Sequence, residues 1–138
     1  MNYTRLALAA LGGTVAYFAF GFLVFTRPLI VDEYRKYPAI YRSEEAIKTV
    51  MPAGMACIFL AILVVAVIYA KMYPGESGII DGAQFGALIG IFAVCAFVIH
   101  NYVNLNIGLK LTLLQAVAYF IEWTVVGIVI SLIYRPAA

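Results

Sequence analysis

The chain has 138 residues, of which 65% are hydrophobic and 12% charged, and its mean hydropathy is +1.00. Soluble domains are usually about half apolar and about a quarter charged, so this composition indicates an integral membrane protein. The net charge of +2 is small and the basic residues lie between the apolar stretches, which does not favour nucleic-acid binding.

Four apolar stretches follow one another along the chain, at about residues 6–25, 47–70, 82–102 and 111–134. Each has the roughly 20 residues that a helix needs to cross a hydrocarbon core of about 30 Å. The first is longer than the apolar region of a signal peptide, so we expect it to be retained. The sequence therefore predicts an all-α integral membrane protein, with a single four-helix bundle over residues 1–138.

An even number of spans places both termini on one side of the membrane. The terminal side has three basic residues and the other side has six: Arg27, Arg35, Lys36, Arg42, Lys48 and Lys110. Because lysine and arginine favour the cytoplasm, this difference predicts that both termini face outward.

The long loop after the first span contains Tyr34, Tyr37 and Tyr41 at helical spacing, although Pro38 interrupts a continuous helix. These tyrosines could form a docking surface or, as amphipathic rings prefer, anchor the loop at the headgroup level. Ser43 then has the character of an N-cap, and the acidic residues after it suit the first turn of a helix.

A polar stripe on the fourth span is the most informative feature of the sequence. Glu122 lies near the middle of that span, where a charge costs roughly 2.5–3.5 kcal/mol. Tyr119, Gln115 and Thr112 precede it on nearly the same helical face, whereas the residues that follow on this face are apolar. The stripe thus opens toward the Lys110 end and stops at Glu122.

Two interpretations of Glu122 remain open. It could end a half-channel that binds a proton, cation or amine, or it could join helices through hydrogen bonds. Thr14 and Tyr17 of the first span lie at a comparable expected depth, and His100 and Asn101 lie near the mouth of the stripe. We regard these four residues as candidate partners.

Gly82, Gly86 and Gly90 form a row with a spacing of four residues along the third span. Small residues at this spacing allow two helix backbones to approach closely. The row predicts tight packing, either within the chain or between two copies.

His100 is the only histidine. It could relay protons or ligate a haem, but a haem held between two helices normally needs a second ligand. The sequence has no metal-binding cysteine pattern and no catalytic serine, histidine and acid set, so we predict no metal, no cofactor and no catalytic residues.

Several stretches together resemble a bacterial family of small four-span membrane proteins of unknown function. They are Met1-Asn2, residues 21–29 at the end of the first span, the glycine row at 82–90, and the leucine-rich residues 111–114. The resemblance implies a multi-pass protein of the bacterial inner membrane and carries no activity.

From these features we predict a protein that works by helix association, as a structural or accessory component of a homo-oligomer or a larger membrane complex. The alternative is a small proton- or cation-coupled transporter or channel that uses Glu122. A membrane enzyme or haem subunit that uses His100 comes third.

Overall fold

The protein is seen in a computed structural model that describes residues 1–73 and 78–135. The helices are α1 (Tyr3–Phe25), α2 (Pro28–Tyr34), α3 (Glu44–Met72), α4 (Ile79–Ala93), the π-helical segment η1 (Val94–Ile99), α5 (His100–Asn104) and α6 (Leu109–Ile133). No strand occurs in these two ranges. Within the described ranges four helices are long and apolar enough to cross a membrane: α1, α3, α6 and the helix that α4, η1 and α5 form together. The predicted all-α class with four spans is confirmed.

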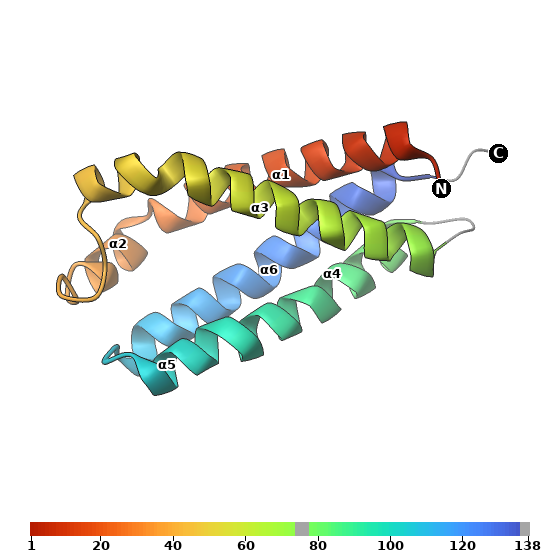
Figure 1. Cartoon of the computed structure of the whole chain (residues 1–138). Coiled ribbons are helices and arrows are strands. Elements are labelled where there is room, and N and C mark those ends of the chain that lie inside the picture. The colour runs from red at the N-terminus through yellow and green to blue at the C-terminus, as the bar shows by residue number, and fades with distance from the viewer. Residues whose placement is uncertain (74–77, 136–138) are drawn as a thin grey trace.

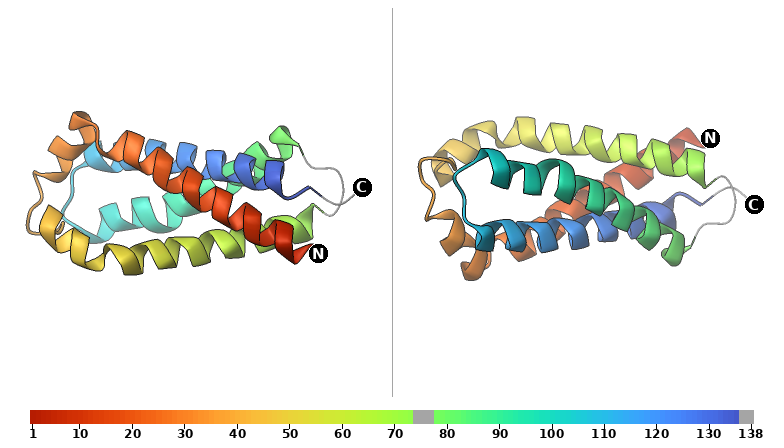
Figure 2. Two further views of the ribbon diagram at one scale, coloured as in Figure 1. Left: turned by 90° about the horizontal axis from the view of Figure 1, so that it is seen from above. Right: turned by 90° about the horizontal axis from the view of Figure 1, so that it is seen from below.

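The four long helices run alongside one another as a bundle (Figures 1 and 2). Helix α6 packs against α4 on one side and α1 on the other, and α1 also packs against α3. Near its first residues α3 diverges from α6, and the short helix α2 contacts α6 at that end instead. The two ends of the bundle are therefore built differently.

The apolar core lies in the half of the bundle that contains the start of α1 and the end of α6. Small residues let the helices approach there, and aromatic rings fill the remaining space. The core is made of Leu6, Ala9, Ala10, Ile62, Ala66, Tyr69, Ala70, Phe85, Ala93, Trp123, Val126, Ile130 and Tyr134. At the same end Arg5 donates a hydrogen bond to the backbone oxygen of Arg135. This half is closed by apolar packing.

The glycine row lies inside the chain, where it faces α6. Gly82, Gly86 and Gly90 are all buried, and a Cβ atom on Gly86 would lie 2.5 Å from the backbone oxygen of Trp123. Van der Waals packing of closely approaching backbones is a main source of helix association in membranes. In the structure the row packs against α6 of the same chain.

The N-cap predicted at Ser43 is confirmed, because its hydroxyl oxygen accepts a hydrogen bond from the Ala46 backbone N–H at 3.3 Å. Glu44 and Glu45 occupy the first turn of α3, where carboxylates interact favourably with the helix dipole. Helix α3 continues through Pro52.

Candidate functional site

The polar stripe of α6 faces the interior of the bundle. Thr112, Gln115 and Glu122 are buried, and Glu122 is 1% exposed, while Tyr119 is half-buried. Their spacing of three or four residues puts one polar group on each successive turn, about 5 Å apart along the helix. The stripe therefore forms a column between the α2 end and the middle of the bundle.

Glu122 has an unusual environment for a buried acid. Among the described residues, neither carboxyl oxygen has a hydrogen-bond partner. Tyr17 of α1 interacts with it electrostatically, without a hydrogen bond of standard geometry. A Cβ atom on Gly21 would lie 3.1 Å from Oε1, and the ring of Trp123 packs edge-on against Tyr17 at 5.6 Å. Tyr17 and Gly21 of α1 thus face an acid that lacks a fixed hydrogen-bond donor.

Two tyrosines cap the column at the α2 end. The side-chain amide of Gln115 donates to the hydroxyl of Tyr34 at 2.7 Å and lies 3.4 Å from that of Tyr41. The rings of Tyr34 and Tyr41 meet edge to face, with their centroids 4.7 Å apart. The hydroxyl groups of Tyr34 and Tyr41 therefore face Gln115 in the interior of the bundle. From the sequence, a docking surface and an anchor at the headgroup level were the two alternatives for these tyrosines.

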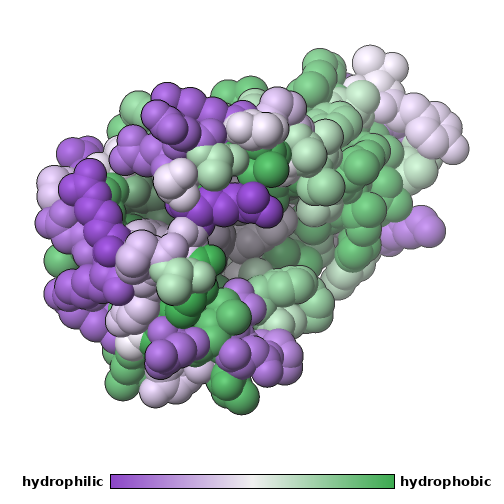
Figure 3. All heavy atoms as spheres, turned by 60° about the vertical axis from the view of Figure 1, so that its left-hand side comes forward, coloured by the Kyte–Doolittle hydropathy of each residue, from purple (hydrophilic) through white to green (hydrophobic). Residues whose placement is uncertain are grey.

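Tyr119 lies one helical turn from both Gln115 and Glu122. Its ring packs against Phe25 with the ring centroids 5.3 Å apart, and its hydroxyl lies within electrostatic range of Tyr34 and Glu122. Figure 3, which brings the α2 end forward, shows hydrophilic side chains around a hollow at this end. Polar side chains thus follow one another along the column from this end of the bundle to Glu122.

An ion cluster around the buried Glu33 holds α2 against the start of α6. Glu33 is 4% exposed, and its Oε1 accepts hydrogen bonds from Lys110 at 2.6 Å and from Lys36 at 2.7 Å. These bonds lower the pKa of Glu33, with Lys110 as the main cause. In addition, the backbone N–H of Gly108 donates to the Tyr37 hydroxyl at 2.8 Å. This cluster was not predicted from the sequence, because the loop was expected to lie at the membrane surface.

Not all predicted partners reach the stripe. The hydroxyl of Thr14 donates to the backbone oxygen of Ala10 at 2.7 Å, and Thr14 lines a groove between α1 and α3. His100 and Asn101 are exposed on α5. The structure thus brings only Tyr17 of the four to Glu122. In the ranges that the structure describes, no group of three His, Cys, Asp or Glu side chains could hold a metal ion.

The Glu33 cluster predicts an acid-sensitive bundle. Since the pKa of Glu33 is lowered in the folded protein, its contribution to stability is complete above the ordinary glutamate value of about 4.3 and is lost as the pH falls through the lowered value. We expect the thermal unfolding temperature in detergent to fall over this range, and Glu33→Gln to remove that part of the dependence. Asp32→Asn is the matched control, because the Asp32 side chain is 66% exposed. An equal effect of both variants would contradict the assignment.

No curated protein and no solved structure matches the chain significantly. A family model described as a protein of unknown function, DUF1761, matches residues 8–131, which agrees with the resemblance noted in the sequence. With four apolar helices of membrane-spanning length and a match over nearly its whole length, the chain belongs to the DUF1761 family.

Proposed function

We propose that this protein is a small membrane transporter or channel in which Glu122 takes up and releases a proton from the α2 end. The observation that carries the proposal is the buried carboxyl group whose two oxygens have no hydrogen-bond partner among the described residues. Ionisable groups inside the membrane are expensive, and they usually mark ion paths or proton relays. A group that binds nothing permanently is available to exchange a proton.

Glu122 makes no hydrogen bond of standard geometry that would join α6 to the described residues of another helix. Hydrogen bonds across membrane helices contribute about 0.6–2 kcal/mol each, but this role requires a partner on another helix. The glycine row already supplies the close contact between α4 and α6. The accessory role in a homo-oligomer or a larger complex, which the sequence also suggested, stays a prediction.

A proton fits the surroundings of Glu122 better than a metal cation. Hard cations such as Ca²⁺ and Mg²⁺ take about six or more oxygen ligands. The described groups near this carboxyl group are the phenols of Tyr17 and Tyr119 and the glycine Gly21. Burial also disfavours the charged carboxylate. A carboxylic acid that is neutral at rest, and that releases and regains one proton, therefore suits the site.

The two directions along α6 differ in chemistry. Toward α2, Tyr119, Gln115 and the Tyr34–Tyr41 pair provide hydroxyl and amide groups on successive turns. Toward the termini, Val126 and Ile130 are fully buried in the apolar core. Protons would therefore enter from the α2 end, which the distribution of basic residues assigns to the cytoplasm.

The test is proton flux into liposomes that contain the purified protein and a pH-sensitive dye, driven by a potassium diffusion potential. We expect the wild type to carry flux above protein-free liposomes and Glu122→Gln to abolish it, because an amide cannot release a proton at neutral pH. Glu45→Gln, which changes an exposed glutamate in the first turn of α3, is expected to keep the flux. Absence of flux in the wild type, or full flux in Glu122→Gln, would overturn the proposal.

A further inference from the structure

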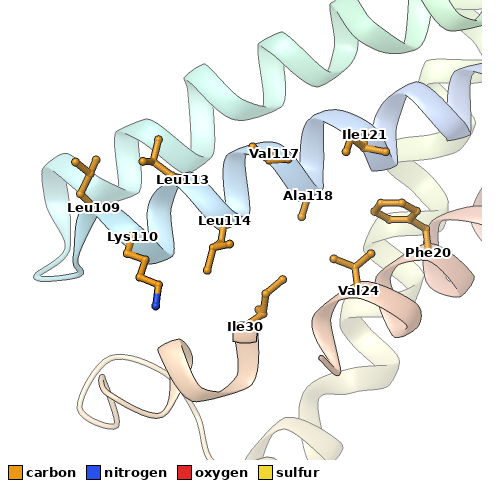
Figure 4. Close-up of a pocket in the computed structure, with 10 residues that line it drawn as sticks. All are labelled: Phe20, Val24, Ile30, Leu109, Lys110, Leu113, Leu114, Val117, Ala118 and Ile121. Carbon is orange, nitrogen blue, oxygen red and sulfur yellow. The ribbon is translucent and has the colours of Figure 1, made fainter. Parts of the chain in front are cut away.

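An apolar groove of about 610 Å³ runs along the outside of the bundle, between α6 and the α1–α2 corner. Phe20 and Val24 line it from α1, Ile30 from α2, and Leu114 and Ile121 from α6. Figure 4 shows these side chains on the two walls of the groove. Its apolar lining and elongated shape suit a hydrocarbon chain.

The groove has a positively charged mouth. Among its lining residues Lys110 is the charged one, and Figure 4 shows the Lys110 amino group extending from α6 toward α2. Lys110 and Lys36 share the single carboxylate of Glu33, so this trio keeps one net positive charge. The Lys110 side chain is 62% exposed, and an ammonium group has three donors, of which Glu33 occupies one. An anionic group can bind beside it without breaking the cluster.

The length of the groove matches one leaflet of a membrane. Between Lys110 and Ile121, α6 rises about 16 Å at about 1.5 Å per residue. Half of a hydrocarbon core of about 30 Å is about 15 Å. A lipid whose headgroup lies at Lys110 would therefore reach the far end of the groove with its acyl chain.

We propose that this groove binds one acyl chain of an anionic phospholipid, with the lipid phosphate at Lys110. The proposal does not depend on proton exchange at Glu122. A second groove, of about 760 Å³ between α1 and α3, serves as an internal comparison, because none of its described lining residues is charged. The two grooves differ in charge, so an anionic lipid should select the first.

The experiment measures lipid binding to the purified full-length chain by native mass spectrometry, with phosphatidylglycerol and phosphatidylcholine of identical acyl chains. We expect phosphatidylglycerol to be retained preferentially, and Lys110→Gln to weaken its binding about fivefold, as the loss of one basic residue near an anionic lipid predicts. Val117→Trp is expected to fill the groove and to remove the preference, since Val117 lines it and is 61% exposed.

Val15→Trp is the matched control, because Val15 lines the second groove and is 68% exposed. It should leave the preference for phosphatidylglycerol unchanged. Equal retention of both lipids would mean ordinary annular lipid only, and equal loss in the two tryptophan variants would mean that neither groove is selective. Displacement of phosphatidylglycerol by soluble glycerol phosphate would identify a phosphate site without a role for the acyl chain. Each of these three results would overturn the proposal.

Discussion

Gly86→Val is expected to separate α4 from α6 and to cost about 3 kcal/mol or more of stability. A Cβ atom at this position would lie 2.5 Å from the Trp123 backbone oxygen and 2.8 Å from the Thr124 Cα atom. Backbone atoms inside a helix cannot move aside as the end of a flexible side chain can, so the two helices must shift apart. Overpacking of a core typically costs 1–3 kcal/mol, and two additional methyl groups beyond the Cβ atom place this variant at the upper end.

Gly54→Ala is the matched control, since a Cβ atom on Gly54 would have nothing within 4 Å. Alanine has the higher helix propensity by about 1 kcal/mol, so this variant should be neutral or slightly stabilising. Thermal unfolding in detergent, followed through the fluorescence of Trp123, measures both variants. If Gly86→Val unfolds at the wild-type temperature, the α4–α6 contact described here is absent in the membrane protein.

The spans could be predicted because length and apolarity alone decide whether a helix crosses a membrane. The helices extend the predicted 6–25 and 47–70 stretches by up to three residues at either end. The π-helical segment at Val94–Ile99 could not be predicted, because no proline or glycine marks it in the sequence. The glycine row indicated close packing, but its spacing contains no information about which helix is the partner.

The polar stripe on α6 could be predicted from helical spacing, whereas the two tyrosines that bind its end could not. The hydrogen bonds from Gln115 reach Tyr34 and Tyr41, which lie 81 and 74 residues away, and no local pattern records such a pairing. Thr14 lies on nearly the same face of α1 as Gly21, which contacts Glu122, but two helical turns or about 10 Å away from it. The sequence bounds each span but leaves open which turns of two neighbouring helices lie opposite each other.

Glu33 was missed for a related reason. Its sequence neighbours give it the appearance of one charge among several in a polar loop, and the structure buries it between Lys36 and Lys110. The one signal was the shortage of acidic partners for Lys110 in its own short loop. That signal does not distinguish an ion pair from a lysine at the headgroup level.

Glu122→Met is expected to make the protein more stable and inactive at the same time. An unsatisfied buried polar group costs about 1–3 kcal/mol, and a methionine of similar length removes this cost while it fills the same space beside Gly21. We therefore expect an increase in the free energy of unfolding of roughly 1–3 kcal/mol, together with complete loss of proton flux. Thermal unfolding in detergent and flux in liposomes, measured on one preparation, check the two effects.

Gln115→Met is the comparison that gives Glu122→Met its meaning, because it removes an amide whose hydrogen bonds are present. It should lower stability by about 0.5–1.5 kcal/mol, the net worth of a typical hydrogen bond, with a further cost for the unpaired tyrosine hydroxyl. A change to methionine is thus expected to raise the free energy of unfolding at Glu122 and to lower it at Gln115, although the two positions lie two helical turns apart on the same stripe. If Glu122→Met destabilises the protein as Gln115→Met does, Glu122 holds the helices together, and the structural interpretation replaces the proposed exchange site.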